Sequence, residues 1–390
     1  MFDLRLLKRV DWALFAAVLG LSLYGLVMIY SATRAPEAAG LAPLSQFAQR
    51  QIWWLLIGLG AFAIVLVWEY EALARWHLVC YGAIMLALLA VLKVGHTAMG
   101  GSRWIAIAGF RLQPSEFAKI AVILSLAAFV SRRGDTVRQL PVVLKSLMIA
   151  AGPVLLVLVQ PDFGTALVVI AIWFGVLYLA GADRRQLGGI LGSGLLLFAL
   201  MWNADRLPLD RFPRSAAKVL AHLRLKDYQK RRLTIFLEPQ SDPLGAGYHV
   251  IQSRLAIGSG QLAGRGLFHG TQSRLRFIPE RHTDFIFSVV GEELGLVGSA
   301  AMLLLYLFVF WRGLRIAARA RDALGSLLAA GAISMLIFHT IVNVGMCINI
   351  MPITGIPLPF VSYGGSNMLA SFVAFGLLQN VHMRRTRIIF

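Results

Sequence analysis

Ten stretches of mostly apolar residues divide this chain. They cover residues 11–31, 52–68, 77–94, 115–131, 142–159, 163–182, 186–203, 285–311, 325–346 and 367–382. A hydrocarbon core needs about 20 such residues per helix. Charged residues make up 14% of the chain, which is too few to cover a soluble fold, where about 25% is usual. The sequence therefore predicts an all-α integral membrane protein with about ten transmembrane helices, residues 1–390 forming a single polytopic domain.

The distribution of Lys and Arg predicts the orientation. One set of short connections, together with both chain ends, holds 17 basic residues, and the opposite set holds five. Because basic connections stay in the cytoplasm, both termini are predicted to be cytoplasmic. Residues 204–284 then form a large periplasmic loop between the seventh and eighth helices. Two amphipathic segments of this loop, residues 216–237 and 250–257, are predicted to lie in the membrane interface, and a packed cap without a ligand is the alternative.

The net charge of +18 also bears on the partners. In a membrane protein we interpret this charge as the basic residues that set the topology and as an attraction to membrane lipids and to an anionic lipid substrate. We predict no nucleic-acid partner.

A few ionisable residues fall inside the apolar stretches, where each needs a partner or a water-filled cavity. Glu116 and Lys119 lie three residues apart, on one face of a helix, and can pair. One interpretation is a polar cavity open to the outside, in which Lys119 attracts phosphate or tunes a catalytic acid. The other is a structural ion pair that locks two helices. Glu292 and Glu293 lie deeper, and one of them is expected to face the same cavity while the other pairs with a neighbouring helix.

Two aspartates stand at expected helix starts. Asp162 follows Pro161, and an acidic cap at the positive helix end explains it. Capping is also the simple interpretation of Asp284, but Asp284 lies at the membrane surface, next to Arg281 and His282, at the end of a basic loop. These neighbours favour a functional role.

Other polar features carry weaker predictions. His339 and Asn343, four residues apart, are expected to make hydrogen bonds between helices. Glycine-rich runs at residues 258–266 and 362–366 permit close backbone approach, and their N–H groups are able to receive phosphate oxygens.

Four blocks of sequence occur in order: residues 113–119 (QPSEFAK), 160–165 (QPDFGT), 280–287 (ERHTDFIF) with 291–295 (GEELG), and 359–366 (PFVSYGGS). Together they resemble the SEDS family (shape, elongation, division and sporulation) over residues 11–385. Residues 242–248 (DPLGAGY) and 269–273 (HGTQS) favour its elongation branch over its division branch. One departure is Gly260-Gln261, where the family usually has paired glycines.

The resemblance implies a peptidoglycan glycosyltransferase of the bacterial inner membrane that polymerises lipid II during cell elongation and rod-shape maintenance. It also implies a class B penicillin-binding protein as partner. A division polymerase, a lipid II flippase and a scaffold for the transpeptidase are the alternatives. Because the donor is α-linked and the product β-linked, we expect a single inverting displacement.

Roles are predicted for twelve residues. Asp284 is the expected general base, by position and by family match, and Glu116 and Lys119 orient or tune it. Predicted substrate contacts are Arg103, Arg111, Gln113, Ser115, Asp162, Arg281, His282, Ser362 and Ser366. A divalent cation, Mg or Mn, is a possible bridge between pyrophosphate and carboxylates, although no dedicated metal motif is visible.

Overall fold

The structure, a computed structural model, describes residues 8–34, 44–94, 96–98, 101–107, 110–203, 227–243, 245–275 and 277–385. A helix occupies each of the ten predicted stretches. These helices are α1 (Trp12–Thr33), α2 (Gln46–Val67), α4 (His77–Val94), α5 (Pro114–Ser131), α6 (Leu140–Val159), α7 (Phe163–Leu179), α8 (Arg184–Asn203), α13 (Ile286–Ala318), α14 (Ala323–Cys347) and α15 (Gly365–Met383).

Seven of these helices are long and apolar enough to cross a membrane, and α4 and α7 contain shorter apolar stretches. The predicted class, a multi-pass helical membrane protein, is confirmed. The count of ten crossings and the side on which each connection lies stay predictions.

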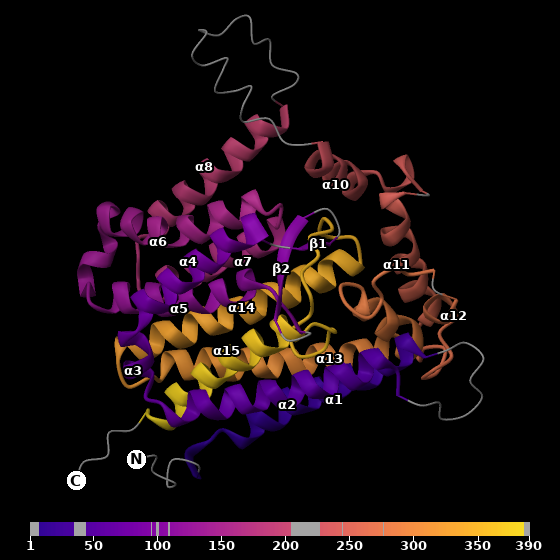
Figure 1. Cartoon of the computed structure of the whole chain (residues 1–390), viewed down its shortest axis with the longest axis horizontal. Helices are drawn as coiled ribbons and strands as arrows, with labels where there is room; N and C mark the ends of the chain where they lie inside the picture. The colour runs from indigo at the N-terminus through magenta and orange to yellow at the C-terminus, as the bar shows by residue number, and fades with distance from the viewer. Residues whose placement is uncertain are drawn as a thin grey trace, which may run out of the picture.

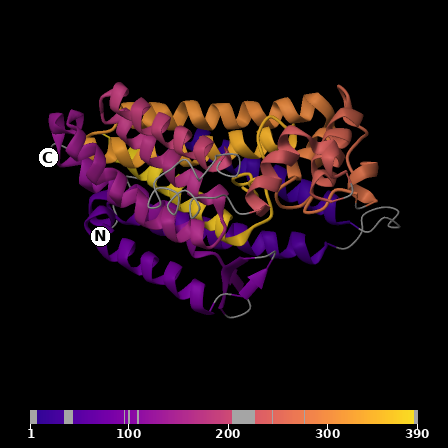
Figure 2. The same cartoon turned by 90° about the horizontal axis from the view of Figure 1, so that it is seen from above.

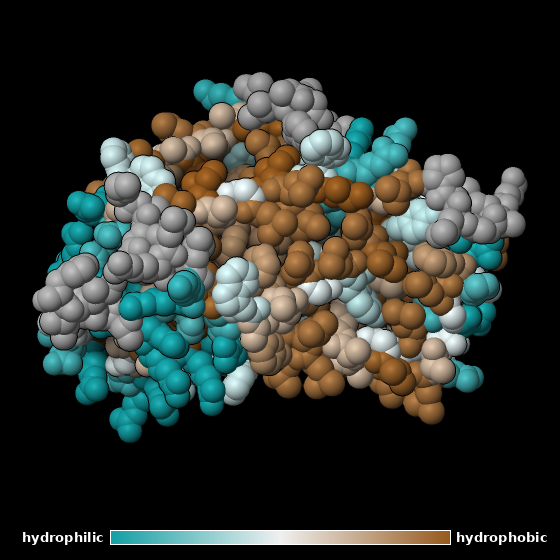
Figure 3. Space-filling view, turned by 90° about the horizontal axis from the view of Figure 1, so that it is seen from below, coloured by the Kyte–Doolittle hydropathy of each residue, from teal (hydrophilic) through white to brown (hydrophobic). Residues whose placement is uncertain are grey.

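The long helices run in roughly one direction, and α14 lies at their centre against α5, α7, α13 and α15 (Figures 1 and 2). Most residues of α5 and α14 are buried, whereas Leu187 is the one buried residue of α8. Hydrophobic residues spread across the middle of the face in Figure 3, and hydrophilic ones gather at the end where both termini lie. This pattern is that of a bundle whose apolar belt faces lipid.

Shorter elements complete the described chain. They are α3 (Tyr70–Arg75), β1 (His96–Ala98), β2 (Gly101–Ile107), β3 (Phe110–Leu112), η2 (Gly134–Arg138), α10 (Asp227–Leu237), η4 (Pro239–Ser241), α11 (Ala246–Gly260) and α12 (Thr271–Arg274). The strands form a small antiparallel sheet in the order β1-β2-β3, which the sequence analysis did not predict. The predicted interfacial segments correspond to α10 and α11, although residues 216–226 lie outside the described residues.

The helix α13 is interrupted at Gly295, whose φ of 63° is not helical. Residues 261–265 of the glycine-rich run cross α13 at this point. The N–H groups of Leu296 and Val297 donate to the carbonyls of Gln261 and Leu262 at 2.9 and 3.1 Å, while Arg265 donates to the Glu292 carbonyl at 3.0 Å. A Cβ on Gly260 would lie 1.9 Å from the carbonyl oxygen of Gly291. The glycines therefore serve close backbone packing, and the N–H group of Arg265 is bound within the protein instead of facing a phosphate.

Two buried carboxylates, those of Glu292 and Glu293, stabilise the contact between the glycine-rich run and α13. Glu293 accepts hydrogen bonds from the Ser31 hydroxyl of α1 at 2.7 Å and from the Phe268 N–H at 3.2 Å. Glu292 accepts from the N–H groups of Gln272 and Ser273 at 2.6 and 3.0 Å. The prediction that one of the pair contacts a neighbouring helix is confirmed for Glu293. The other prediction is wrong, because Glu292 binds the start of α12.

The backbone of Gln261 is strained where the glycine-rich run crosses α13. Its φ of 49° and ψ of −135° lie in a region that favours glycine, and such a residue costs about 1–3 kcal/mol. We expect Gln261→Gly to raise the free energy of unfolding by about 1 kcal/mol, seen as a higher melting temperature of the purified protein. Gln261→Ala is the matched control, because it shortens the side chain without relieving the backbone. An equal gain in both variants would refute a backbone cause.

Candidate active site

Asp284 lies in a turn immediately before α13, and the structure fixes this turn through its backbone. The Asn343 amide of α14 donates to the carbonyl oxygens of Asp284 and Ile356, at 2.8 and 2.7 Å. The Ser362 hydroxyl donates to the Thr283 carbonyl at 2.8 Å and accepts from the Leu358 N–H at 2.8 Å. Asn343 therefore ties α14 to the turn before α13 and to the loop before α15 instead of to another helix, and Ser362 holds the same turn.

The carboxylate of Asp284 is not a helix cap. The N-cap of α13 is Phe285, and no side chain caps it, so the capping interpretation of Asp284 is wrong: the helix begins one residue later than that interpretation requires. The side chain instead faces Gly355, whose φ is +71° and where an added Cβ would lie 3.4 Å from Asp284 Oδ2. A half-buried carboxylate that is not used by its own helix is available for chemistry.

The start of α7 lies against the same loop. A Cβ on Gly164 would come within 2.8 Å of the Thr354 carbonyl oxygen, so α7 and the loop before α15 touch. Asp162 caps α7 as predicted, because its Oδ1 accepts from the Thr165 N–H at 3.2 Å. Its Oδ2 accepts from the Gln113 amide at 3.0 Å and from the Ser115 hydroxyl at 3.4 Å. The caps of α5 and α7 are therefore one hydrogen-bonded group.

Ser366 joins this group, because its hydroxyl accepts from the Gln113 N–H at 2.9 Å. Arg103, on β2, binds the turn between α6 and α7: its Nε donates to the Gln160 carbonyl at 3.0 Å, and a second guanidinium nitrogen donates to the Pro161 carbonyl. A guanidinium has five N–H donors, so these two bonds orient the group and still leave it able to contact an anion. Five of the predicted contact residues are thus brought to one place.

The pKa of Asp284 is raised from its usual 3.8 to about 6, and burial is the largest cause. The nearby carboxylates of Glu280 and Asp162 contribute to this rise, while Arg232 and Arg103 oppose it. These charges place Asp284 between acids and cations contributed by β2, α7, α10 and its own turn. A carboxylate with a pKa near the working pH suits proton transfer.

Glu116 and Lys119 form an ion pair of 2.7 Å, and both side chains are buried. Lys119 Nζ also lies 2.9 Å from His339 Nε2, and His339 Nδ1 lies 3.2 Å from the Pro357 carbonyl oxygen. Since a carbonyl only accepts, the Nδ1 carries the proton and Nε2 accepts from Lys119. This geometry fits the helix-locking interpretation: α5 is tied to α14 and to the loop behind Asp284.

The remaining predicted contacts lie nearby in different settings. Arg281 Nε donates to the Ala32 carbonyl of α1 at 2.5 Å. The His282 ring packs against Phe47 and Tyr363, with centroid distances of 4.5 and 5.4 Å. Burial lowers the pKa of His282, so it offers a neutral aromatic ring instead of a cation. Arg111 lies on β3, and its side chain is outside the described part of the chain.

The divalent cation stays a prediction. Within the described ranges, no three His, Cys, Asp or Glu side chains lie close enough together to hold a metal ion.

Sequence reasoning missed four residues of this site. Arg232 and Glu280 contribute charge at Asp284, Gly355 faces its carboxylate, and the buried Thr354 hydroxyl has no partner in the described structure. Glu280 stands within the block that marked Asp284. Arg232 lies in the basic run 230–232 of α10, and nothing local distinguishes it from its neighbours.

Comparisons with known proteins identify the relatives of this chain. The family model of FtsW, RodA and SpoVE, described as cell cycle protein, matches residues 11–387. The chain is 37% identical over 381 residues to the peptidoglycan glycosyltransferase MrdB of Escherichia coli strain K12, with 97% of this chain and 94% of that relative covered. It is 35% identical over 381 residues to the probable peptidoglycan glycosyltransferase FtsW of Trichlorobacter lovleyi, with 96% and 93% covered.

Solved structures agree. A chain from work described as "Structural coordination of polymerization and crosslinking by a peptidoglycan synthase complex" has a TM-score of 0.78 at 29% identity, with 96% of this chain and 98% of that chain covered. The crystal structure of the Thermus thermophilus rod shape determining protein RodA has a TM-score of 0.68 at 27% identity, with 97% and 98% covered. With a family model matching almost from end to end and relatives above 30% identity over nearly their whole length, this chain belongs to the SEDS family of FtsW, RodA and SpoVE.

Proposed function

We propose that this protein is a peptidoglycan glycosyltransferase that polymerises lipid II, with Asp284 as general base, in cell elongation and rod-shape maintenance. The observation that carries the proposal is the half-buried Asp284 carboxylate, with a pKa of about 6, between Arg103 and Arg232. The elongation role is supported by the similarity to MrdB and to the RodA structure.

The chemistry follows from what each reactant lacks. A sugar 4-hydroxyl is a poor nucleophile until a base removes its proton. As that oxygen bonds to the anomeric carbon of the second sugar, the bond from this carbon to the lipid pyrophosphate breaks, and the configuration inverts. The proton passes to Asp284, and the electron pair of the broken bond leaves with the pyrophosphate.

The leaving pyrophosphate mainly needs its charge neutralised. Arg103 is held by two backbone carbonyls. Arg232 of α10 donates to the Ile353 carbonyl at 3.4 Å and lowers the pKa of Asp284. Both arginines are positioned to stabilise the negative charge that develops on the leaving pyrophosphate near Asp284. We assign the buried Glu116, Lys119 and His339 no contact with substrate: they are positioning residues that hold the loop behind the base.

Orientation and partner belong to the same proposal. With both termini cytoplasmic, Asp284 and the segments α10 to α12 lie at the periplasmic end, where lipid II presents its sugars. A crosslinking enzyme of the class B penicillin-binding type is the proposed partner, because the solved relative at TM-score 0.78 comes from a complex that coordinates polymerization and crosslinking.

The test incubates purified protein, with and without the partner transpeptidase, with labelled lipid II. Glycan polymer on a denaturing gel supports the enzyme. If the protein is a flippase, it should translocate the lipid in vesicles without forming polymer. If it is a scaffold, polymer should come only from another enzyme, and changing Asp284 should leave the product intact.

A pH dependence follows from the base. Because Asp284 acts only when ionised and its pKa is about 6, the rate should be full well above that pH and fall about tenfold per unit below it. Initial polymerisation rates measured from about pH 5 to about pH 8 test this. A rate that stays flat down to about pH 5 would exclude a base with this pKa.

A further inference from the structure

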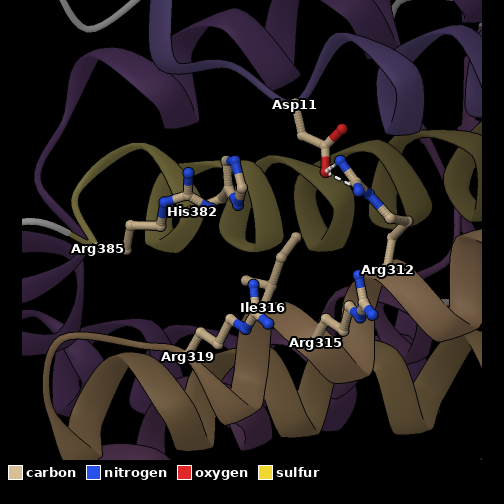
Figure 4. A pocket seen from close by; sticks show the side chains of 7 residues that line it. All are labelled: Asp11, Arg312, Arg315, Ile316, Arg319, His382 and Arg385. Carbon is tan, nitrogen blue, oxygen red and sulfur yellow. Dashed lines mark hydrogen bonds and ion pairs between the residues drawn. The ribbon is translucent and has the colours of Figure 1, made fainter.

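A second cluster of charged side chains lies far from Asp284, where the start of α1 and the ends of α13 and α15 meet. It forms a pocket, which we call the arginine pocket, lined by Asp11, Arg312, Arg315, Arg319, His382 and Arg385 (Figure 4). At about 1.5 Å per residue, Arg312 lies about 40 Å along α13 from its first residue. The pocket is therefore at the opposite end of the bundle from the proposed active site, beside both termini (Figure 1).

The positive charge of the pocket is built by helix geometry. Arg312, Arg315 and Arg319 follow one another at spacings of three and four on α13, which puts them on one helix face. Figure 4 shows Arg315 and Arg319 on the α13 side, with His382 and Arg385 across the opening. Four guanidinium groups thus surround one small space.

Little of this charge is neutralised inside the protein. Asp11 is the carboxylate that lines the pocket, and Arg312 already binds it at 2.6 Å while the Leu14 N–H takes its other oxygen at 3.1 Å. Within the described residues, Arg315, Arg319 and Arg385 make no ion pair. A nearby arginine behaves differently, because Arg321 is paired with Glu71 and Asp322.

The surroundings of the pocket are those of a membrane interface. The side chains next to it in sequence include the exposed Trp12 and Trp311, which are 59% and 45% accessible, and Leu314 at 44%. Arg315 lies over the Trp311 ring at 4.0 Å. Tryptophan is enriched where hydrocarbon meets headgroups, and basic pockets between helices at that depth receive anionic headgroups.

We propose that the arginine pocket binds a phosphate group, supplied either by the headgroup of an anionic phospholipid or by free phosphate in solution. Guanidinium groups bind phosphate oxygens through paired N–H donors. A bound phosphate relieves the repulsion among Arg315, Arg319 and Arg385, and it ties the end of α13 to the chain just after α15. This site is independent of the transferase chemistry, so its test needs no activity measurement.

The experiment uses the full chain in nanodiscs. Retention of phosphatidylglycerol from a phosphatidylcholine mixture is measured by native mass spectrometry, and inorganic phosphate is titrated calorimetrically into protein in pure phosphatidylcholine. The pocket variant is Arg315→Gln with Arg319→Gln. The matched control is Arg133→Gln with Arg184→Gln, which removes the same charge from two arginines that also lie over aromatic rings, Phe129 and Tyr178.

We expect the pocket variant to bind phosphatidylglycerol about tenfold more weakly than wild type, and the control to stay within about twofold. That result supports a lipid headgroup. Saturable binding of inorganic phosphate, lost in the pocket variant without any lipid preference, supports free phosphate. Wild type and pocket variant binding both probes equally would overturn the proposal. If the double variant does not fold, Arg319→Gln alone is tested. This variant should fold, because the Arg319 side chain is exposed and makes no internal hydrogen bond in the described structure. It must still weaken binding if the proposal holds.

Discussion

Purified Asp284→Asn protein is expected to polymerise labelled lipid II about a thousandfold more slowly than wild type, since a general base contributes about 10²–10⁴-fold. Asparagine keeps the shape of the side chain, and the Asn343 amide still donates to the backbone carbonyl of residue 284, but asparagine accepts no proton at the working pH. The measurement is the initial rate of glycan formation on gels, with wild type and variant at equal concentration.

Folding provides the control for this variant. A carboxylate whose pKa is about 6 in the folded chain and 3.8 when exposed binds its proton more tightly when folded. Its ionised form therefore costs stability, a cost that grows from about pH 4 and is complete above about pH 6. Asp284→Asn removes that cost, so at neutral pH its melting temperature should equal or exceed that of wild type.

A second variant separates the site from a general loss of charge. Asp135→Asn makes the same chemical change at an exposed position of η2 and should keep the wild-type rate. Equal polymer from Asp284→Asn and wild type would remove Asp284 from its role. A variant with a clearly lowered melting temperature would contradict the pKa argument instead.

Lys119→Met should lower the free energy of unfolding by about 3–5 kcal/mol, because breaking a buried ion pair leaves an uncompensated charge. Lys119 is fully buried, and its removal strands the Glu116 carboxylate and the acceptor nitrogen of His339. Thermal unfolding in detergent, followed by circular dichroism, measures the loss.

The double variant Glu116→Gln with Lys119→Met makes this prediction specific. It removes both charges together, so it should unfold at a higher temperature than Lys119→Met alone. A single variant that loses less than about 1 kcal/mol, or a double variant that is worse than the single, would show that the pair is not what ties α5 to α14.

The helices could be predicted from the sequence because lipid imposes a simple requirement. A helix in hydrocarbon must be long and apolar, whatever its neighbours are, and a helix occupies each of the ten stretches. The largest boundary errors are at α2, which begins six residues before its predicted stretch, and at α13, which ends seven residues after its own. The small sheet was missed because β1 and β3 are three residues each, too short to show an alternating pattern.

Apart from Arg103 and Arg111, the predicted site residues all lie in the sequence blocks. Gln113, Ser115 and Asp162 belong to two blocks, and the structure joins them through the shared caps of α5 and α7. Arg232 was missed because its distance from Asp284 along the chain is bridged by folding of the loop, which no local pattern encodes. The start of α13 was predicted one residue too early, and that error made Asp284 look like a cap.

The interruption of α13 at Gly295 has a mechanical consequence. The N–H groups of Leu296 and Val297 donate to the carbonyls of Gln261 and Leu262, and not to carbonyls one turn earlier in α13. The ordinary helical hydrogen bonds therefore do not stiffen α13 at Gly295. Residues 286–294, which follow Asp284, are instead bound to α12 through Glu292. We therefore expect a displacement of α12 to be transmitted to residues 286–294 more readily than to residues 296–318, which lie beyond the interruption.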